Sequence, residues 1–194
     1  MRIGYILTVF PKLSETFVTN EIVELIKRGH DIYIFSISYP GEKIVQPEIT
    51  KYSLLKKSHY PPPFFKFAFE VQKLYSLFSR NNQKSRGNEY ARKLYCRVVA
   101  KHFSKTIKKL NLDVLHAHFA DDAAYVAMLI SKINRMPFTF TAHAIDIFFN
   151  PNVRALKEIS INAAAIITVS HYNKDYLHKL TGVGFDKIHV VRAC

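Results

Sequence analysis

Short apolar runs alternate along this chain with stretches that have helical periodicity. Residues 2–8 and 31–37 are apolar runs typical of buried strands. From about residue 15 to 28, apolar side chains recur at steps of three and four, which predicts a helix with one apolar face. We expect Ser14 to cap this helix and Glu15 to lie in its first turn. Strand, helix and strand in succession predict a βαβ unit with parallel strands.

The same alternation returns in the second half of the chain. A loop is expected at residues 143–152. The pattern as a whole predicts an α/β fold with a doubly wound, mostly parallel, Rossmann-like sheet, formed by one domain over residues 1–194. The strands of this half are predicted at 113–117, 138–142, 164–169 and 188–191, and its helices at 121–133, 153–161 and 170–180.

A basic segment separates the two regular halves. Residues 51–110 hold 15 of the 28 Lys and Arg residues but only 2 of the 15 acidic ones, so they carry the whole net charge of +13. Helical periodicity within this segment covers about 64–79 and 88–110, which predicts a largely helical insertion. Such a basic patch attracts an anionic bilayer or a phosphate-bearing polymer. A solvated helix face is the plainer alternative.

Polar residues follow three of the predicted strands at the point where each strand ends. His116 and His118 end the first, His143 follows the second, and Ser170 with His171 follows the third. In an open parallel sheet, ligands bind outside the carboxyl ends of the strands. We therefore expect these side chains to line one crevice.

His143 is the sharpest single candidate for chemistry. Asp146, three residues later, is placed to fix the tautomer of this histidine or to contact a sugar hydroxyl. A purely structural His–Asp pair is the alternative. Ser170 and His171 open a predicted helix and are candidates to contact a phosphate or a hydroxyl, although a plain helix cap explains Ser170 as well.

The turn after the first strand lacks the Gly-x-Gly-x-x-Gly fingerprint of dinucleotide sites. A helix start can still bind anions through its free amide groups. Lys12 and the hydroxyls of Ser14 and Thr16 would add hydrogen-bond donors, whereas Glu15 counts against tight phosphate binding. An ordinary helix start is the competing interpretation.

The sequence also allows two less well supported hypotheses, a metal-dependent hydrolase and a Ser–His–Asp hydrolase. His116 and His118 share one face of a strand and could bind zinc if a third ligand came from another residue, with Asp121, Asp122 and His143 as the candidates. Histidines at strand ends are more often hydrogen-bonded than metal-bound.

A Ser–His–Asp hydrolase would use Ser170, His143 and Asp146. No serine of the chain lies in a Gly-x-Ser-x-Gly elbow, which disfavours this chemistry.

Five segments in order resemble the amino-terminal, acceptor-side domain of a family 4 glycosyltransferase of the two-domain GT-B fold. The resemblance implies retaining transfer of a sugar from a nucleotide-sugar to a glycan or lipid-linked acceptor in polysaccharide biosynthesis. It places His143 near the transferred sugar and residues 14–16 near the donor phosphates. It requires no cofactor and no metal ion. The resembling segments are 10–17 with Glu21 and Ile22, 28–30, 116–120, 138–146 and 167–170.

The resemblance also implies a partner domain. In that family a carboxy-terminal domain holds most nucleotide contacts, and no such domain is present in these 194 residues. We therefore expect this half alone to have little or no transferase activity. The first turn also lacks the glycine pair that many members carry there.

The expected cellular location follows from simpler features of the sequence. The apolar run 3–7 is too short for a signal-peptide core, and charged residues interrupt the aromatic stretch 63–78, which excludes a spanning helix there. Cys96 and Cys194 lack metal or redox spacing. These features predict a cytoplasmic protein, with the basic segment at the inner face of the membrane.

The main alternative is a non-enzymatic α/β domain that binds nucleic acid or another polyanion through the basic segment. Phenylalanine and tyrosine residues are interleaved with its cations. No helix-turn-helix, zinc-finger or RNA-recognition signature is present, so no nucleic-acid partner is expected.

Overall fold

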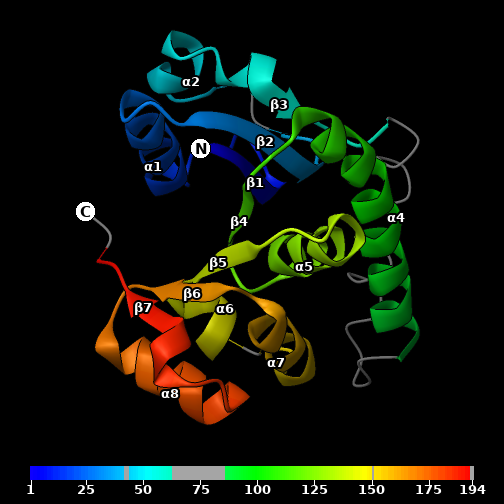
Figure 1. Ribbon diagram of the computed structural model, residues 1–194, viewed down its shortest axis with the longest axis vertical. Helices are drawn as coiled ribbons and strands as arrows, with labels where there is room; N and C mark the ends of the chain where they lie inside the picture. Colours follow the sequence, from blue (N-terminus) through cyan, green and yellow to red (C-terminus); the bar gives the residue numbers. More distant parts are fainter. Residues whose placement is uncertain (42–43, 63–85, 150, 193–194) are drawn as a thin grey trace.

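The computed structural model describes residues 1–41, 44–62, 86–149 and 151–192 (Figure 1). Its centre is a seven-stranded sheet in the order β3-β2-β1-β4-β5-β6-β7, and every neighbouring pair is parallel. The predicted α/β fold is confirmed. The strands are β1 Arg2–Val9, β2 Asp31–Ser38, β3 Ser58–His59, β4 Val114–His118, β5 Phe138–Ala142, β6 Ala165–Thr168 and β7 Ile188–Val190.

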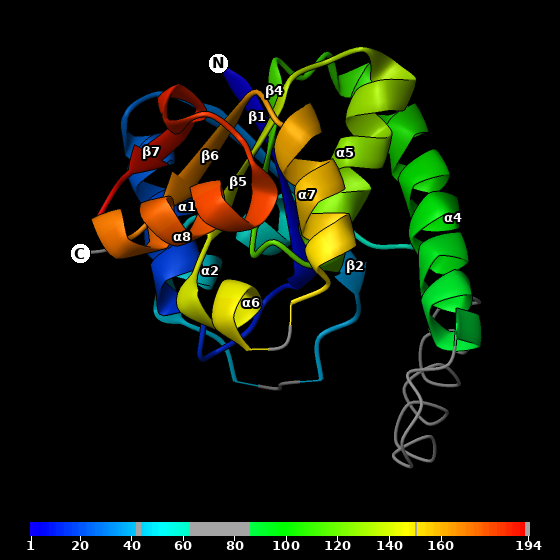
Figure 2. The same ribbon diagram turned by 90° about the horizontal axis from the view of Figure 1, so that it is seen from below.

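Helices cover both faces of the sheet, as a doubly wound fold requires. Helices α1 and α2 lie over β1 and β2 on one face, and α4, α5 and α7 lie on the other (Figures 1 and 2). The helices are α1 Thr16–Lys27, α2 Pro47–Lys51, α4 Arg86–Leu110, α5 Asp122–Asn134, α6 Ala144–Phe148, α7 Val153–Asn162 and α8 His171–Thr181, with 3-10 turns η1 Leu54–Lys57 and η2 Phe185–Lys187.

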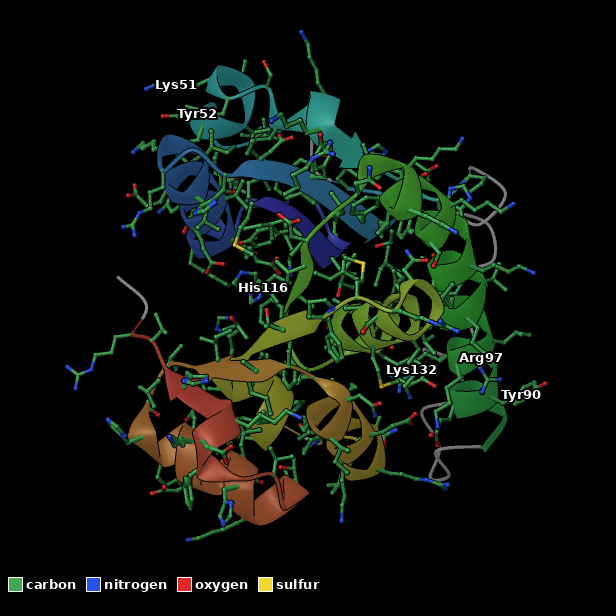
Figure 3. The ribbon with its side chains drawn as sticks, in the orientation of Figure 1. Lys51, Tyr52, Tyr90, Arg97, His116 and Lys132 are labelled. Carbon is green, nitrogen blue, oxygen red and sulfur yellow. The ribbon has the colours of Figure 1, made fainter. Side chains whose placement is uncertain are left out.

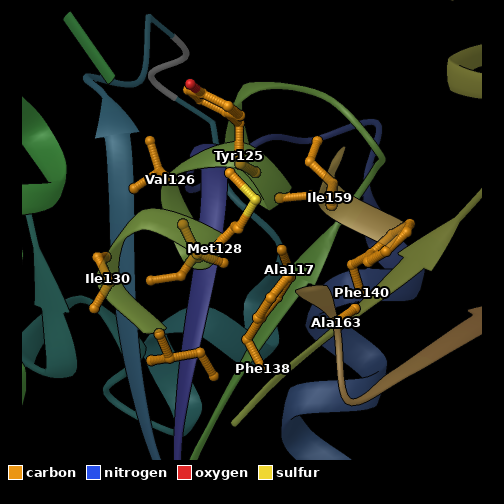
Figure 4. Packing of buried hydrophobic residues seen from close by; sticks show 14 of the residues in the cluster. Ala117, Tyr125, Val126, Met128, Ile130, Phe138, Phe140, Ile159 and Ala163 are labelled. Carbon is orange, nitrogen blue, oxygen red and sulfur yellow. The ribbon is translucent and has the colours of Figure 1, made fainter. Parts of the chain in front are cut away.

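Strands β4 and β5 have one apolar and one polar face. In their parallel register, Leu115 pairs with Phe138 and Ala117 with Phe140, and all four pack into the larger core beneath α5 and α7 (Figure 4). Because successive side chains of a strand point to opposite faces, the intervening residues face the α1 side of the sheet. Those residues are His116, His118, Thr139 and Thr141.

Helix α1 buries its predicted apolar face against β1 and β2 in a second, smaller core. Its start differs from the prediction, because the helix begins at Thr16 with Glu15 as the cap residue and no side-chain cap bond. The cap assigned to Ser14 was therefore wrong. Residues 12–15 form a turn in which the Glu15 amide donates to the Lys12 carbonyl at 3.1 Å, and this turn moves the helix start along the chain.

Two regions without clear periodicity contain short elements. The loop expected at 143–152 includes α6, and the stretch after β2 forms α2, η1 and the edge strand β3. Elements of two to five residues are too short to show a period in the sequence. They depend on local capping and on pairing with the sheet.

The predicted helix at 88–110 is confirmed as α4, whereas the predicted helix at 64–79 lies outside the described residues. Helix α4 is 25 residues long but strongly basic along its length. None of the helices in the described ranges has the apolar length needed to cross a bilayer.

Candidate active site at the carboxyl edge of the sheet

The strand order reverses between β1 and β4, so the helices that follow these two strands, α1 and α5, lie on opposite faces. Ligands of open α/β sheets bind at such a switch point, outside the carboxyl ends of the strands. The turn that contains Ser14 follows β1, His118 ends β4, His143 follows β5 and Ser170 follows β6. Because all of these strands are parallel, the four predicted positions lie at the same edge.

A cavity of about 460 Å³ opens beside the switch point, on the α1 side of the sheet. This size falls within the range of small-molecule sites. Helix α1 forms one wall, and strands β4 to β6 with the residues that follow them form the other. Its lining includes the side chains of Phe17, Glu21, His118, Thr141 and His143.

The Glu21 carboxylate, on a side chain that is 41% exposed, is the centre of a polar cluster whose other members, Tyr5, His116 and His118, are buried. Its Oε1 accepts a hydrogen bond from the Tyr5 hydroxyl at 2.6 Å and lies 3.4 Å from Nε2 of His118. Nε2 of His116 is 3.7 Å from the same oxygen. Burial alone would raise the pKa of Glu21, but its interactions with His118, His116 and Tyr5 outweigh burial and lower this pKa to about 2. Glu21 is therefore an anion at neutral pH.

Two of the histidines link Glu21 to the mouth of the cavity. Nδ1 of His118 lies 3.2 Å from Nε2 of His143, which continues the contact between His118 and Glu21. His116 lies two residues before His118 on β4 (Figure 3), and its Nδ1 is 2.8 Å from the Thr139 hydroxyl. The positions of all three imidazoles are thus fixed by neighbouring polar groups.

His143 is held neutral by its surroundings. Its ring packs against those of Phe17 and Phe119, with centroid distances of 5.0 and 4.7 Å. Burial, and next the charge of His118, lower the pKa of His143 to about 4. At neutral pH the imidazole therefore carries no charge and can accept a proton or a hydrogen bond from a hydroxyl.

Asp146 ties together the turns that follow β4 and β5. Its Oδ2 accepts hydrogen bonds from the Ala120 amide at 2.6 Å and from the His143 amide at 3.2 Å. Burial raises its pKa to about 6, against the opposing effect of these amide bonds. The carboxylate thus holds the His143 backbone in place. Its other oxygen, Oδ1, is buried with no hydrogen-bond partner among the described residues, and a contact from Asp146 to sugar stays a prediction.

The first turn is less available to an anion than its residues suggested. Nζ of Lys12 pairs with Oε1 of Glu15 at 2.7 Å, so its charge already has a partner. The side chain of Gln46 donates to the Lys12 carbonyl at 2.9 Å and fastens the turn to the connection before α2. The walls of the cavity include none of Lys12, Ser14, Glu15 and Thr16, and their role toward donor phosphates stays a prediction.

Ser170 is the cap of α8. Its Oγ accepts from the Asn173 amide at 3.1 Å, which confirms the cap prediction. His171 is the first residue of α8 and is exposed. Val169, just before the cap, is the residue of this turn that reaches the cavity wall, so binding by Ser170 and His171 stays a prediction.

Sequence reasoning gave Glu21 and Tyr5 no part in the chemistry. Glu21 lies four residues after Phe17 and four before Leu25, so an acidic residue interrupts the apolar stripe of α1. Tyr5 is a single hydroxyl in an otherwise apolar strand. A polar group within a buried stripe was the available signal, because buried polar groups need partners.

Comparison with known proteins agrees with this fold. Residues 14–193 match Glycosyltransferase Family 4. The chain belongs to that family. It is also 30% identical over 93 residues to a Bacillus subtilis (strain 168) protein named as a teichuronic acid biosynthesis glycosyltransferase, TuaC, a match that covers 44% of this chain and 24% of that protein.

Solved structures share the fold at low sequence identity. A glycosyltransferase from Rickettsia africae ESF-5 is 19% identical with a TM-score of 0.58, over 98% of this chain and 42% of that one. UDP-GlcNAc 2-epimerase from Neisseria meningitidis, solved with UDP-GlcNAc bound, is 12% identical with a TM-score of 0.64, over 98% and 45%. This Family 4 chain therefore spans less than half the length of the relatives that it matches.

Proposed function

We propose that this Family 4 chain is the acceptor-side half of a retaining glycosyltransferase. It would transfer a sugar from a nucleotide-sugar to a glycan or lipid-linked acceptor in polysaccharide biosynthesis. The observation that carries the proposal is a neutral His143, fixed by His118 and Asp146, at the switch-point cavity of a Family 4 fold.

The charge pattern of the cavity suits glycosyl transfer. Cleavage of a glycosidic bond passes through an oxocarbenium-like transition state, in which positive charge develops on the sugar ring. A neutral imidazole at His143 adds no repulsion to that charge and can accept a hydrogen bond from a sugar hydroxyl. The anionic Glu21 on the cavity wall adds a favourable field of fixed orientation.

We further propose that a second domain faces the carboxyl edge and supplies the nucleotide site. Large apolar side chains are exposed along this edge on α6, α8 and the segment after α6. Ile145 is 66% exposed, Tyr172 is 72% exposed and Phe149 is 80% exposed. A group of exposed apolar side chains at this edge fits a surface that another domain covers.

The test uses a version of the protein that carries this second domain. His143→Ala should lower kcat by roughly 10²–10⁴-fold, the usual contribution of a positioned acid–base or hydrogen-bonding group. The control is His189→Ala, at an exposed position of β7. Release of nucleoside diphosphate from a panel of nucleotide-sugars measures turnover. An unchanged kcat in the folded His143 variant would reject the role of this residue.

The basic segment supports a location at an anionic bilayer. On α4, Tyr90, Leu94 and Val98 recur every four residues and are 66%, 49% and 37% exposed. Arg97 lies on the same helix, and Figure 3 shows it with Tyr90 on the outer side of the molecule. Basic helices with exposed apolar side chains bind membrane surfaces.

Co-sedimentation with liposomes tests this location. We expect the chain to bind vesicles that contain anionic lipid and to leave neutral vesicles unbound, with binding weakened by salt. Equal binding to both vesicles, or none, would remove the membrane from the proposal. Retention on a random DNA duplex at physiological salt would favour the polyanion-binding alternative instead.

A further inference from the structure

One feature of the cavity wall fits a second role beside sugar transfer, because two imidazoles converge there on one carboxylate. His116 and His118 come from β4 and Glu21 comes from α1, and one ligand-capable atom of each lies within 4.8 Å of the other two. Nε2 of His118 is buried and has no hydrogen-bond partner among the described residues, although it faces Oε1 of Glu21. We propose that Glu21, His116 and His118 form a binding site for a divalent transition metal ion, with zinc as the best match.

The distances fit a zinc site. Zinc binds imidazole nitrogen and carboxylate oxygen at about 2.0–2.2 Å, so adjacent ligand atoms of a tetrahedral site are roughly 3.3–3.5 Å apart. Oε1 of Glu21 lies 3.4 Å from Nε2 of His118 and 3.7 Å from Nε2 of His116. The ligand nitrogens of His116 and His118 lie within 4.8 Å of each other, so the two rings would draw together when the ion binds.

The surrounding groups orient the ligands as outer-shell groups of metal sites do. The Tyr5 hydroxyl donates to the carboxylate of Glu21 at 2.6 Å. The Thr139 hydroxyl donates to a main-chain carbonyl at 3.5 Å and lies 2.8 Å from Nδ1 of His116, so it accepts the proton of that nitrogen. This leaves the lone pair of His116 on Nε2, where the Thr141 hydroxyl now donates at 3.2 Å and can rotate away.

The third ligand of this site, Glu21, is not one of the three candidates that the sequence offered. Asp121 accepts from the Ala123 amide, Asp122 pairs with Arg92 at 2.7 Å, and Nε2 of His143 contacts the other nitrogen of His118. Glu21 takes the third place because α1 packs directly over β4. Those interactions keep the three earlier candidates out of the ligand set.

The donor atoms select the class of ion. Two imidazoles and one carboxylate suit zinc and other late first-row ions, whereas magnesium and calcium prefer oxygen ligands alone. Three protein ligands leave one tetrahedral position for a ligand from outside the chain. Glu21 and His118 also line the 460 Å³ cavity, so that position would be accessible from it. The proposed transferase function does not require this metal.

Calorimetric titration of the chelator-treated chain with zinc chloride tests the site. We expect one equivalent of zinc bound with micromolar or tighter affinity, a higher melting temperature with zinc, and no binding of magnesium. Glu21→Gln should weaken zinc binding by more than the roughly 10–100-fold that outer-shell changes cause, and His118→Ala should abolish it. His189→Ala, at an exposed histidine, should bind zinc as the wild type does.

Wild-type protein that binds less than one equivalent, or binds only at millimolar zinc, would overturn the proposal. Wild-type affinity in a folded Glu21→Gln variant would also overturn it. If His118→Ala does not fold, the wild-type stoichiometry and the Glu21→Gln titration still decide the matter. None of these measurements depends on sugar transfer, so the metal site and the transferase function can fail separately.

Discussion

Opposite edges of the central sheet carry their charged groups in different ways. At the carboxyl edge, Tyr5, Glu21 and three histidines from several elements are packed against one another. At the amino edge, a cavity of about 590 Å³ lies between the carboxyl-terminal halves of α4 and α5. Its walls include four cations and no acidic residue: Lys101, Lys105, Lys108 and Arg135.

The two edges differ in how firmly their polar side chains are held in place. The groups at the carboxyl edge are short side chains held by hydrogen bonds, so removing one leaves another buried without a partner. The amino-edge lysines are long, exposed side chains on one helix, and their effect is mainly a summed electrostatic field. We therefore expect substitutions at the carboxyl edge to change stability and substitutions at the amino edge to change only long-range attraction.

The largest expected effect concerns Asp121, which caps α5 just after β4. It is partly buried, and desolvation of its carboxyl group raises its pKa from 3.8 to about 7. Between about pH 4 and 7 the folded chain retains a proton that the unfolded chain has lost, so this group makes the protein less stable as pH rises through that window. Asp121→Asn should remove this loss.

The expected gain of Asp121→Asn over wild type is up to about 4 kcal/mol at pH 7.5 relative to pH 4, since each unit of pKa shift corresponds to about 1.4 kcal/mol. Urea unfolding of both proteins from pH 4 to 7.5 measures it. Comparing the two proteins removes the opposing contributions of the histidines and of Glu21. The same stability difference at both ends of the range would contradict the prediction.

The next effect compares two acids on α1. Glu21→Ala should cost about 1–3 kcal/mol of unfolding free energy, because the buried Tyr5 hydroxyl loses its acceptor. Glu24→Ala, three residues away, breaks only half-exposed pairs with Lys27 and Arg28 at 3.7 and 3.1 Å and should change it by less than about 0.5 kcal/mol. Urea unfolding at neutral pH measures both. Equal losses of unfolding free energy in the two variants would show that Glu21 contributes no more to stability than an ordinary surface charge.

The smallest effect on stability is expected at the amino edge. Replacing Lys101, Lys105 and Lys108 together by Gln should change the unfolding free energy by no more than about 0.5 kcal/mol, as is usual for surface positions. The same variant should elute from a heparin column at lower salt than wild type, because it has lost three positive charges. A loss of several kcal/mol would mean that these lysines belong to the packed structure.

Much of the fold could be predicted because it depends on local patterns. The apolar runs of β1, β2, β4, β5 and β6 and the stripes of α1 and α5 have the period of the element that they form. The short elements α2, α6 and β3 were missed, since they are too short to show a period and depend on local capping or on pairing with the sheet. The helix start at Thr16 was misplaced because the turn before it is set by the Lys12–Glu15 pair.

The sequence by itself determined which strand ends carry His118, His143 and Ser170, because parallel strands that alternate with helices must bring their carboxyl ends to one edge. Only the tertiary structure decided which of these groups touch. Packing of α1 over β4 brings Glu21 to the histidines across about a hundred residues of chain, a contact that depends on helix orientation and not on any local pattern. Ser170 instead caps α8 through a local bond from the Asn173 amide.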